Sequence, residues 1–238
     1  MILNRESIKH GIIGDMIRKT DTPGLNNRLS DAERQASLRT AMKDAVSGEP
    51  VWVFGYGSLM WNPAFHFAEK RGGLVHGYRR RFCMWIAGGR GTPEVPGLML
   101  ALDRGGSCRG MAFRIAPDQV DEELDIIWSR EMGGGSYRAR WVNVRTDRGM
   151  VRALTFVIDR NDRRYSSAIP RDLMIAHIAN ARGWLGSCAE YLANTVAHLR
   201  KLGIEDGPMH DMLNRVRAHA GGTPTGRWED GRWLTAAI

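Results

Sequence analysis

The pattern of hydrophobic and polar positions first indicates a helix and then a buried strand. Residues 30–46 are rich in Ala, Arg, Lys and Leu, and Ser30 stands three positions before Glu33, the spacing of a helix capping box. We therefore predict a helix over this stretch. The Gly-Glu-Pro sequence at 48–50 ends it. The continuous apolar run 51–54 that follows is typical of a short buried strand.

The middle of the chain is predicted to be mostly sheet. Stretches of strand character are separated by Gly-rich or charged turns and lie at residues 74–85, 97–102, 109–115, 137–146 and 151–158. A helix over 117–130 interrupts them, because acidic residues gather in its first turn, where the helix dipole favours negative charge.

The last part of the chain changes to helical periodicity. Helices are predicted at 171–182, at 187–202, where Ser187 and Glu190 form a second capping box, and at 208–218. Because the strands come first and the helices last, we predict an α+β fold with a small mixed β-barrel or sheet flanked by helices.

The same pattern divides the chain into three predicted parts. They are an N-terminal helical extension over 1–50, a main domain over 51–220, and a C-terminal tail over 221–238 that has no usable periodicity. A chain of 238 residues is long enough to bury one substantial core.

The composition is that of an ordinary globular protein, with 43% hydrophobic and 25% charged residues. No apolar run approaches the roughly 18 residues that span a bilayer, and the first residues lack the apolar core of a secretory signal. We therefore expect a cytoplasmic protein with no membrane partner. Cys83, Cys108 and Cys188 are odd in number and never form a C-x-x-C pair, which argues against a disulfide framework and a structural zinc site. Reduced and mostly buried thiols are expected.

The formal net charge of +8 is compatible with nucleic acid, a membrane surface or a small anionic ligand. The arginines are spread over the whole chain, and no recognition-helix or aromatic-strand pattern accompanies the short clusters at 79–81 and 163–164. We expect no nucleic-acid partner. The seven histidines form no H-E-x-x-H or other close ligand cluster, so no metal site is expected.

A segment with paired glycines follows the buried strand: Phe54-Gly55-Tyr56-Gly57-Ser58-Leu59-Met60-Trp61. Glycines at a strand end can turn the backbone and point several N–H groups at one spot, which makes a cradle for an anion or a carbonyl oxygen. A tight structural turn is the alternative. The segment is not a dinucleotide fingerprint, because Met60 replaces the third glycine, and it is not a G-x-S-x-G nucleophile elbow around Ser58.

A carboxylate stands at the end of the helix predicted over 117–130. Glu131 lies beside apolar side chains and before a glycine run, so it could be half-desolvated, with a raised pKa suited to proton transfer near neutrality. The alternative is a helix-end glutamate that pairs with Arg130 or Arg138.

The loop at 88–93 holds a third candidate, Arg90. Its guanidinium could bind a carboxylate, because the planar fork matches two carboxylate oxygens. The loop could equally be a plain hairpin connection, and the residues favour neither interpretation.

Five segments occur in a definite order between residues 51 and 218. They are Val-Trp-Val-Phe-Gly-Tyr-Gly-Ser-Leu-Met-Trp-Asn-Pro at 51–63, Gly-Tyr-Arg-Arg-Arg-Phe at 77–82, the loop 91–97, Trp-Ser-Arg-Glu-Met at 128–132 and Ala-Glu-Tyr-Leu at 189–192. In sequence and order they resemble the ChaC family of glutathione-specific γ-glutamyl cyclotransferases. The resemblance implies the γ-glutamyl cyclotransferase-like α+β fold with a small barrel.

The resemblance also implies roles for single residues. The family's glycine loop, which holds the γ-glutamyl group of the substrate, matches Val53, Phe54, Gly55, Tyr56, Gly57, Ser58 and Leu59. Its acid/base glutamate matches Glu131. A further tyrosine matches Tyr137 only loosely, because the link 133–136 is longer than the two-glycine link of eukaryotic relatives. Arg90 is a possible partner for the glycyl carboxylate of the substrate.

The implied reaction converts glutathione, a small peptide, into 5-oxoproline and cysteinylglycine without a cofactor, a metal or a covalent nucleophile. A cyclotransferase that acts on other γ-glutamyl amino acids or on γ-glutamylamines is one alternative, which only the far end of the substrate pocket would distinguish. A non-catalytic binding or regulatory protein with the same fold is the other. The presence of both the glycine loop and the glutamate motif argues against it.

Overall fold

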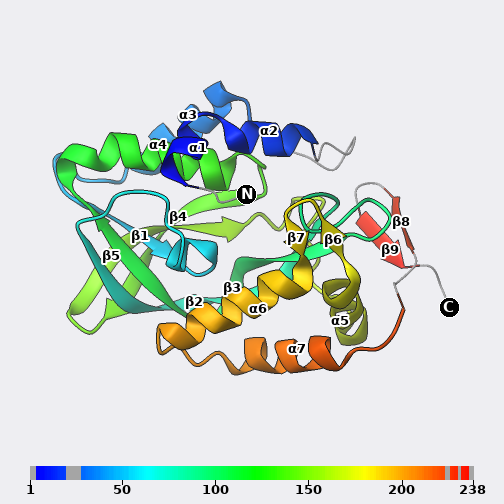
Figure 1. Ribbon diagram of the computed structural model, residues 1–238. Coiled ribbons are helices and arrows are strands. Elements are labelled where there is room, and N and C mark those ends of the chain that lie inside the picture. Colours follow the sequence, from blue (N-terminus) through cyan, green and yellow to red (C-terminus); the bar gives the residue numbers. More distant parts are fainter. Residues whose placement is uncertain (1–3, 20–27, 223–225, 230–231, 236–238) are drawn as a thin grey trace. The chain divides into compact units, whose positions relative to one another are not determined.

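A computed structural model of the protein describes residues 4–19, 28–222, 226–229 and 232–235 (Figure 1). The chain forms two compact units. The first comprises Met1–Ile17, Asn27–Arg80 and Leu102–Asp159, and the second comprises Arg18–Asn26, Arg81–Ala101 and Arg160–Ile238. The predicted boundaries at residues 50 and 220 divide the chain into continuous parts, whereas each unit combines several separate ranges. The predicted division stays a prediction.

The first unit is built on a five-stranded barrel. Its strands are β1 (Val51–Gly55), β2 (Glu69–Ile86), β3 (Gly97–Ile115), β4 (Tyr137–Thr146) and β5 (Gly149–Ile158), of which β2 and β3 continue into the second unit. The strand order around the closed barrel is β1-β3-β2-β4-β5. This confirms the prediction of an α+β fold with a small barrel flanked by helices.

Both antiparallel and parallel pairs close the barrel. Strand β1 pairs antiparallel with β3, so that Val53 lies opposite Phe113, and β4 and β5 form a regular antiparallel hairpin. On its other edge β1 runs parallel to β5, with Trp52 opposite Ala153. The hydroxyl of buried Thr155 in β5 also donates to the Phe54 carbonyl at 3.0 Å. The barrel is therefore mixed, as the sequence predicted.

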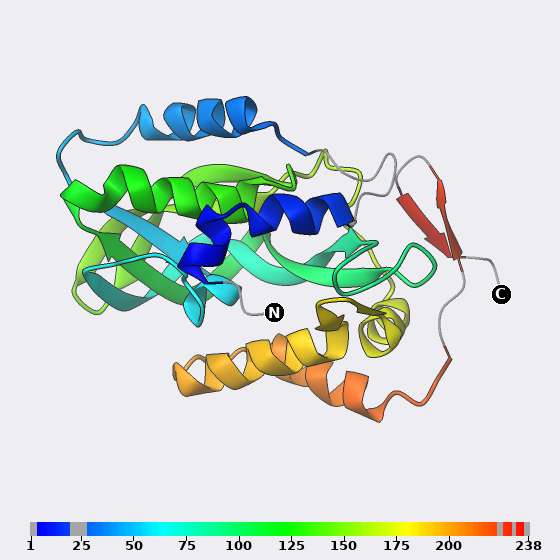
Figure 2. The same ribbon diagram turned by 45° about the horizontal axis from the view of Figure 1, so that its top comes forward.

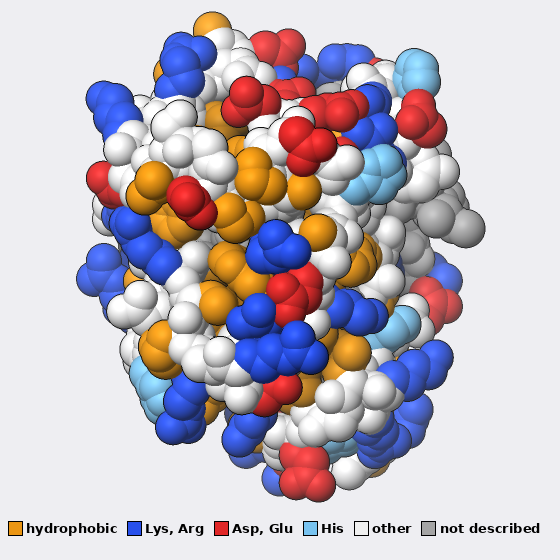
Figure 3. All heavy atoms as spheres, turned by 90° about the vertical axis from the view of Figure 1, so that its left-hand side faces the viewer, with side chains coloured by type: hydrophobic (Ala, Val, Ile, Leu, Met, Phe, Trp, Pro, Cys, Tyr) orange, Lys and Arg blue, Asp and Glu red, His pale blue; other side chains and the backbone are white. Residues whose placement is uncertain are grey.

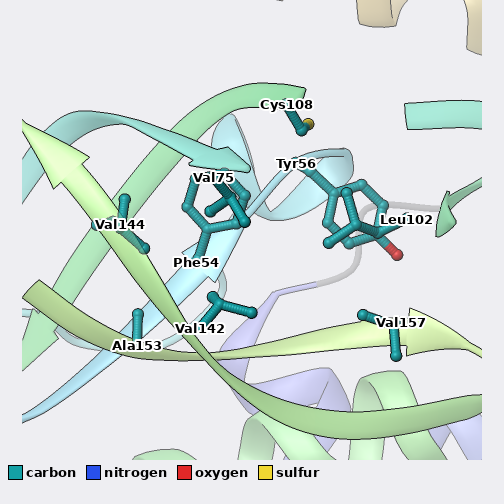
Figure 4. Close-up of a cluster of buried hydrophobic side chains, with 10 residues drawn as sticks. Phe54, Tyr56, Val75, Leu102, Cys108, Val142, Val144, Ala153 and Val157 are labelled. Carbon is teal, nitrogen blue, oxygen red and sulfur yellow. The ribbon is translucent and has the colours of Figure 1, made fainter. Parts of the chain in front are cut away.

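The barrel interior is filled by apolar side chains from all five strands (Figure 4). They are Phe54, Val75, Leu102, Cys108, Ala112, Val142, Val144, Ala153 and Val157, together with the ring of Tyr56 just beyond β1. In β1 the adjacent Val53 and Phe54 are both fully buried, although their side chains point to opposite faces of the strand. This explains why β1 appears in the sequence as a continuous apolar run rather than an alternating one.

Helices cover the first unit from outside the barrel. They are α1 (Arg5–Lys9), α2 (Ile12–Lys19), α3 (Asp31–Met42), the short 3-10 turns η1 (Ser58–Met60) and η2 (Pro117–Gln119), and α4 (Val120–Met132). Trp128 of α4 packs edge-on against Phe156 of β5, with ring centroids 5.1 Å apart. Its indole N–H donates to Ser37 of α3, and Figure 2 shows α3 and α4 side by side.

The second unit consists mainly of three helices and short hairpins. Helices α5 (Arg171–Asn180), α6 (Cys188–Lys201) and α7 (Gly207–Ala218) pack against one another. Two hairpins pair β6 (Arg182–Gly183) with β7 (Gly186–Ser187), and β8 (Gly226–Glu229) with β9 (Arg232–Thr235). Edge-to-face contacts of Phe82 with Tyr191 and of Trp85 with His177 join the end of β2 to α6 and α5.

Most of the predicted elements are confirmed. The capping boxes form: the Ser30 hydroxyl accepts the Glu33 N–H, and that of Ser187 accepts the Glu190 N–H. One prediction was wrong, because the stretches 97–102 and 109–115 belong to the single strand β3. The charged, glycine-rich stretch between them resembles a turn in sequence. In the structure Gly105 and Gly106 adopt φ of 96° and 75°, which lets the chain pass this stretch without leaving the sheet.

Other predictions concern smaller features. The hairpin β8–β9 lies within the tail at 221–238, where residues 223–225, 230–231 and 236–238 are outside those described. Cys83, Cys108 and Cys188 are all buried, as expected. Among the described helices, none combines the length and the apolar character needed to cross a bilayer.

The close contact between β1 and β3 gives a test of the barrel. A Cβ atom at Gly110 would lie 2.3 Å from the Gly55 carbonyl oxygen and 2.6 Å from the Phe54 ring. We expect Gly110→Ala to lower the free energy of unfolding by about 1–3 kcal/mol, because the backbone cannot yield without disturbing the barrel. Urea denaturation measures this. The matched control is Gly72→Ala in β2, where a Cβ meets nothing within 4 Å. Equal stabilities of the two variants would contradict the predicted contact.

Candidate active site

The glycine loop, residues 53–59, leaves the barrel at the end of β1 and enters η1. A Cβ at Gly55 would lie 2.9 Å from the Cβ of Leu59, so the loop folds back more tightly than a larger residue allows. The Met60 N–H donates to the Gly57 carbonyl at 2.9 Å, and the Asn62 N–H donates to the Ser58 carbonyl at the same distance. The sequence predicted this turn where the buried strand ends.

A buried arginine from β2 supports the loop. The Arg80 side chain is largely buried, and its Nε donates to the carbonyl oxygen of Tyr56. Its Nη2 donates to the carbonyl of Arg109 in β3 at 2.7 Å. Arg80 therefore fixes the Tyr56 peptide against two strands of the barrel, and it brings a permanent positive charge to the loop.

A second arginine connects the loop to helix α4. Arg130 Nη2 donates to the Ser58 hydroxyl at 2.8 Å, and Nη1 donates to the carbonyls of Asn62 and Pro63. The side chain is only 6% exposed. Its Nε lies 3.1 Å from Glu131 Oε1. One guanidinium therefore links the helix end that carries Glu131 to the glycine loop.

Glu131 lies in the last turn of α4, with its side chain 16% exposed. Burial raises the pKa of the Glu131 carboxyl, and the positive charge of Arg130 partly opposes this rise. Both interpretations of the sequence therefore describe this side chain: it is desolvated, and it is paired with Arg130. Arg138, the other partner considered, instead lies 2.7 Å from Asp159.

The two remaining candidates have different surroundings. Tyr137 begins β4 and is half-buried, opposite Ile158 of β5. Arg90 belongs to the second unit, where its Nη1 donates to the Ser187 carbonyl at 3.0 Å and its guanidinium lies 5.2 Å from the centre of the Tyr191 ring. These contacts give Arg90 a structural function within the second unit. A substrate-binding function of Arg90 or of Tyr137 stays a prediction.

The surface charge is mixed on the face shown in Figure 3, where basic side chains are interspersed with acidic ones. Within the described ranges, no three His, Cys, Asp or Glu side chains gather into a group able to hold a metal ion. The expectations of no metal and no nucleic-acid partner remain sequence-based predictions.

Sequence reasoning missed the two arginines that organise the site. Arg80 was noted only as a member of a basic cluster, and Arg130 only as a possible partner of Glu131. A signal was present for Arg130, because a basic residue directly before a buried acid at a helix end needs acceptors of its own. Its contacts with Ser58 and Asn62 could not be foreseen, because about seventy residues separate them in the sequence.

The charge of Arg130 should affect the pKa of the neighbouring Glu131 carboxyl. We expect Arg130→Met to raise the pKa of Glu131 further, because it removes the positive charge that lowers this pKa. Carbon-13 NMR titration of the side-chain carboxyls measures the change, with Glu131→Gln used for assignment. The control Arg138→Met removes the partner of Asp159 and should leave Glu131 unchanged. An unaltered Glu131 pKa in Arg130→Met would refute the pairing.

Comparison with known proteins extends these observations. The family described as ChaC-like protein matches residues 51–219. The glutathione-specific γ-glutamylcyclotransferase of Escherichia coli K12 is 40% identical over 79% of this chain and 82% of its own length. The glutathione-specific γ-glutamylcyclotransferase 1 of Homo sapiens is 31% identical over 74% of this chain and 82% of its own length.

The fold is also found in a solved structure. A crystal structure of a yeast γ-glutamyl cyclotransferase specific to glutathione superimposes with a TM-score of 0.64. The two chains are 21% identical, and the match covers 71% of this chain and 99% of the yeast chain. With the family match across β1, the glycine loop, α4 and the helices of the second unit, these similarities establish that the chain belongs to the ChaC-like protein family.

Proposed function

We propose that the protein is a γ-glutamyl cyclotransferase that degrades glutathione to 5-oxoproline and cysteinylglycine. The E. coli and human relatives carry this activity in their names, and the chain covers more than two thirds of each of them. The single structural observation that supports it most is the link through Arg130 between a desolvated Glu131 and the glycine loop. This contact supports the proposal because it joins the proposed proton-transfer group to the proposed binding loop.

The reaction needs no second substrate. In glutathione the α-amine and the γ-carbonyl belong to the same glutamyl unit, so attack of the nitrogen on the carbonyl carbon closes a five-membered lactam. The bond from this carbon to the cysteinyl nitrogen then breaks. The tether between amine and carbonyl already supplies part of the entropic advantage of an intramolecular reaction, and an enzyme adds to it by holding the chain bent for attack. Binding geometry is therefore the first requirement on the loop.

Proton transfer is the second requirement, and Glu131 is proposed to meet it. The free carboxylate takes a proton from the substrate ammonium and so produces the nucleophilic amine. The carboxyl then returns this proton to the departing cysteinyl nitrogen, which leaves as an amine. The nitrogen of the closing ring loses its second proton to the regenerated carboxylate, which passes this proton to the released amine. A raised pKa suits both steps, because the group is most useful when it gains and loses a proton near the working pH.

The glycine loop is proposed to hold the glutamyl group. The N–H groups of Gly57, Ser58 and Leu59 stand around the start of η1, where the first amides of a helical turn have no acceptor within the turn. They could bind the α-carboxylate or the developing oxyanion. Arg80 and Arg130, both largely buried beside the loop, favour negative charge there.

The proton-transfer function predicts the effect of one substitution. Glu131→Gln keeps the size of the side chain but cannot carry the proton, so we expect turnover of glutathione to fall by about 10²- to 10⁴-fold. Thermal unfolding should stay close to that of the wild type. The matched control is Asp121→Asn, an exposed carboxylate in the first turn of the same helix, which should retain full turnover. Near-normal turnover in Glu131→Gln would show that another group transfers the proton.

The substrate is tested with the purified full chain in the presence of a chelator. We expect release of 5-oxoproline from glutathione and much less from γ-glutamyl-alanine, because the E. coli and human relatives are named as specific for glutathione. Release from γ-glutamyl-alanine alone would retain the cyclotransferase chemistry and overturn the glutathione assignment. Release from neither compound, nor from a γ-glutamylamine, would favour a non-catalytic protein.

A further inference from the structure

A second acid of helix α4 is fully buried and takes no part in the proposed chemistry. Both carboxylate oxygens of Glu123 accept hydrogen bonds from the Arg5 guanidinium: Nη2 donates to Oε1 at 2.8 Å, and Nε donates to Oε2 at 3.4 Å. Its Oε2 also accepts the backbone N–H of His66 at 3.0 Å, and the His66 ring nitrogen Nδ1 lies 3.3 Å from Oε1. Glu123 therefore ties together three separate parts of the first unit: α1, α4 and the segment after the glycine loop.

Glu123 and Arg130 lie seven residues apart in α4. Seven residues complete almost two helical turns, so both side chains leave the same face of the helix. Arg130 contacts Ser58, Asn62 and Pro63, and Glu123 contacts His66. We call residues 58–66 the strap. Two charged side chains from one face of α4 hold the strap. Arg130 binds its start and middle, and Glu123 binds its far end.

The backbone of the strap is strained between these anchors. Ala64 adopts φ of 55°, the only positive φ of a non-glycine residue within the described part of the chain. A residue with a Cβ keeps this left-handed conformation only where the surrounding contacts hold it. The nearest anchors are the Pro63 carbonyl, bound by Arg130, and the His66 N–H, bound by Glu123.

Arg5 is the charge that makes this arrangement stable. A fully buried carboxylate is costly unless an opposite charge and hydrogen bonds compensate it. The Glu123 carboxylate holds the pKa of Arg5 above its usual range, mainly through their hydrogen bond. Arg5 lies before residue 51, where the family match begins. The N-terminal extension thus supplies a charge to a helix of the matched region.

We propose that Arg5 and Glu123 form a positioning pair for the active site. Glu123 fixes the end of the strap at His66, the strap fixes the carbonyls that hold Arg130, and Arg130 sets the place and the charge environment of Glu131. The proposal rests on the proposed function for its kinetic consequence. Its structural consequence is independent: without the Glu123 acceptor, the strap is released at its far end.

Two double variants distinguish the loss of the hydrogen-bond acceptor at position 123 from the loss of the two charges. Arg5→Met with Glu123→Gln removes both charges but keeps a side-chain oxygen for the His66 N–H. Arg5→Met with Glu123→Leu removes both charges and the oxygen. Neither leaves a buried uncompensated charge, so both should fold, whereas Arg5→Met alone leaves the buried Glu123 carboxylate without its guanidinium partner. The matched control is Arg34→Ala, which breaks the ion pair between Arg34 of α3 and Asp125 of α4 and removes no contact of the strap.

The Leu variant should shift the pH profile, and the Gln variant should not. A looser Arg130 lowers the pKa of Glu131 less, so the acid limb of kcat/KM for glutathione should move to higher pH, and kcat/KM below this limb should fall relative to the wild type. The His66 amide should exchange its hydrogen faster in the Leu variant only. Arg34→Ala should lower the melting temperature and leave the acid limb in place. If the Gln and Leu variants have the same acid limb of kcat/KM and the same exchange rate of the His66 amide, the pair only stabilises the fold. That result would overturn the proposal.

Readouts without turnover separate this proposal from the proposed function. If the wild type releases no 5-oxoproline from glutathione, the proposed function fails. The exchange rate of the His66 amide and the NMR titration of Glu131 in the two double variants still decide whether the pair positions the strap.

Discussion

The candidate site depends on the guanidinium of Arg130. It reaches the Glu131 carboxylate, the Ser58 hydroxyl and two backbone carbonyls at once. A lysine could not replace it, because an ammonium lacks the planar array of five donors that serves several acceptors in fixed directions. The guanidinium also stays charged at any working pH. The pKa of Glu131 is therefore a balance between burial, which raises it, and this neighbour, which lowers it.

Charged groups are buried around the glycine loop in spite of their cost. Arg80, Arg130 and Glu123 are all largely or fully buried, and each has several hydrogen-bond partners from distant parts of the first unit. Apolar side chains of similar size would often give equal or greater stability. Apolar groups have no directional bonds, however, and would not fix the loop carbonyls in one orientation. The arrangement is better explained by the geometry of the site than by the stability of the fold.

Local signals in the sequence were sufficient for much of the fold. The apolar run of β1, the two capping boxes and the position of Glu131 at a helix end depend on neighbouring residues, and all were predicted. Pairing across the chain was not predictable in the same way, because Arg5 and Glu123 are 118 residues apart. The burial of Arg80 had a subtler cause. Gly77 adopts φ of 84° within β2, and Val75 and Tyr78 on either side of it both pack against the barrel core. Strict alternation from Val75 would have turned Arg79 inward instead of Arg80.

The way in which β1 is held has a consequence for synthesis of the chain. Its carbonyl at Phe54 accepts from a residue 101 positions later, and both of its neighbouring strands follow it by dozens of residues. A strand with such distant partners cannot pair until they have left the ribosome, and contacts of this kind slow folding. A nascent chain therefore carries the apolar run 51–54 as an unpaired edge for a long interval, during which non-native pairing of this segment competes with folding.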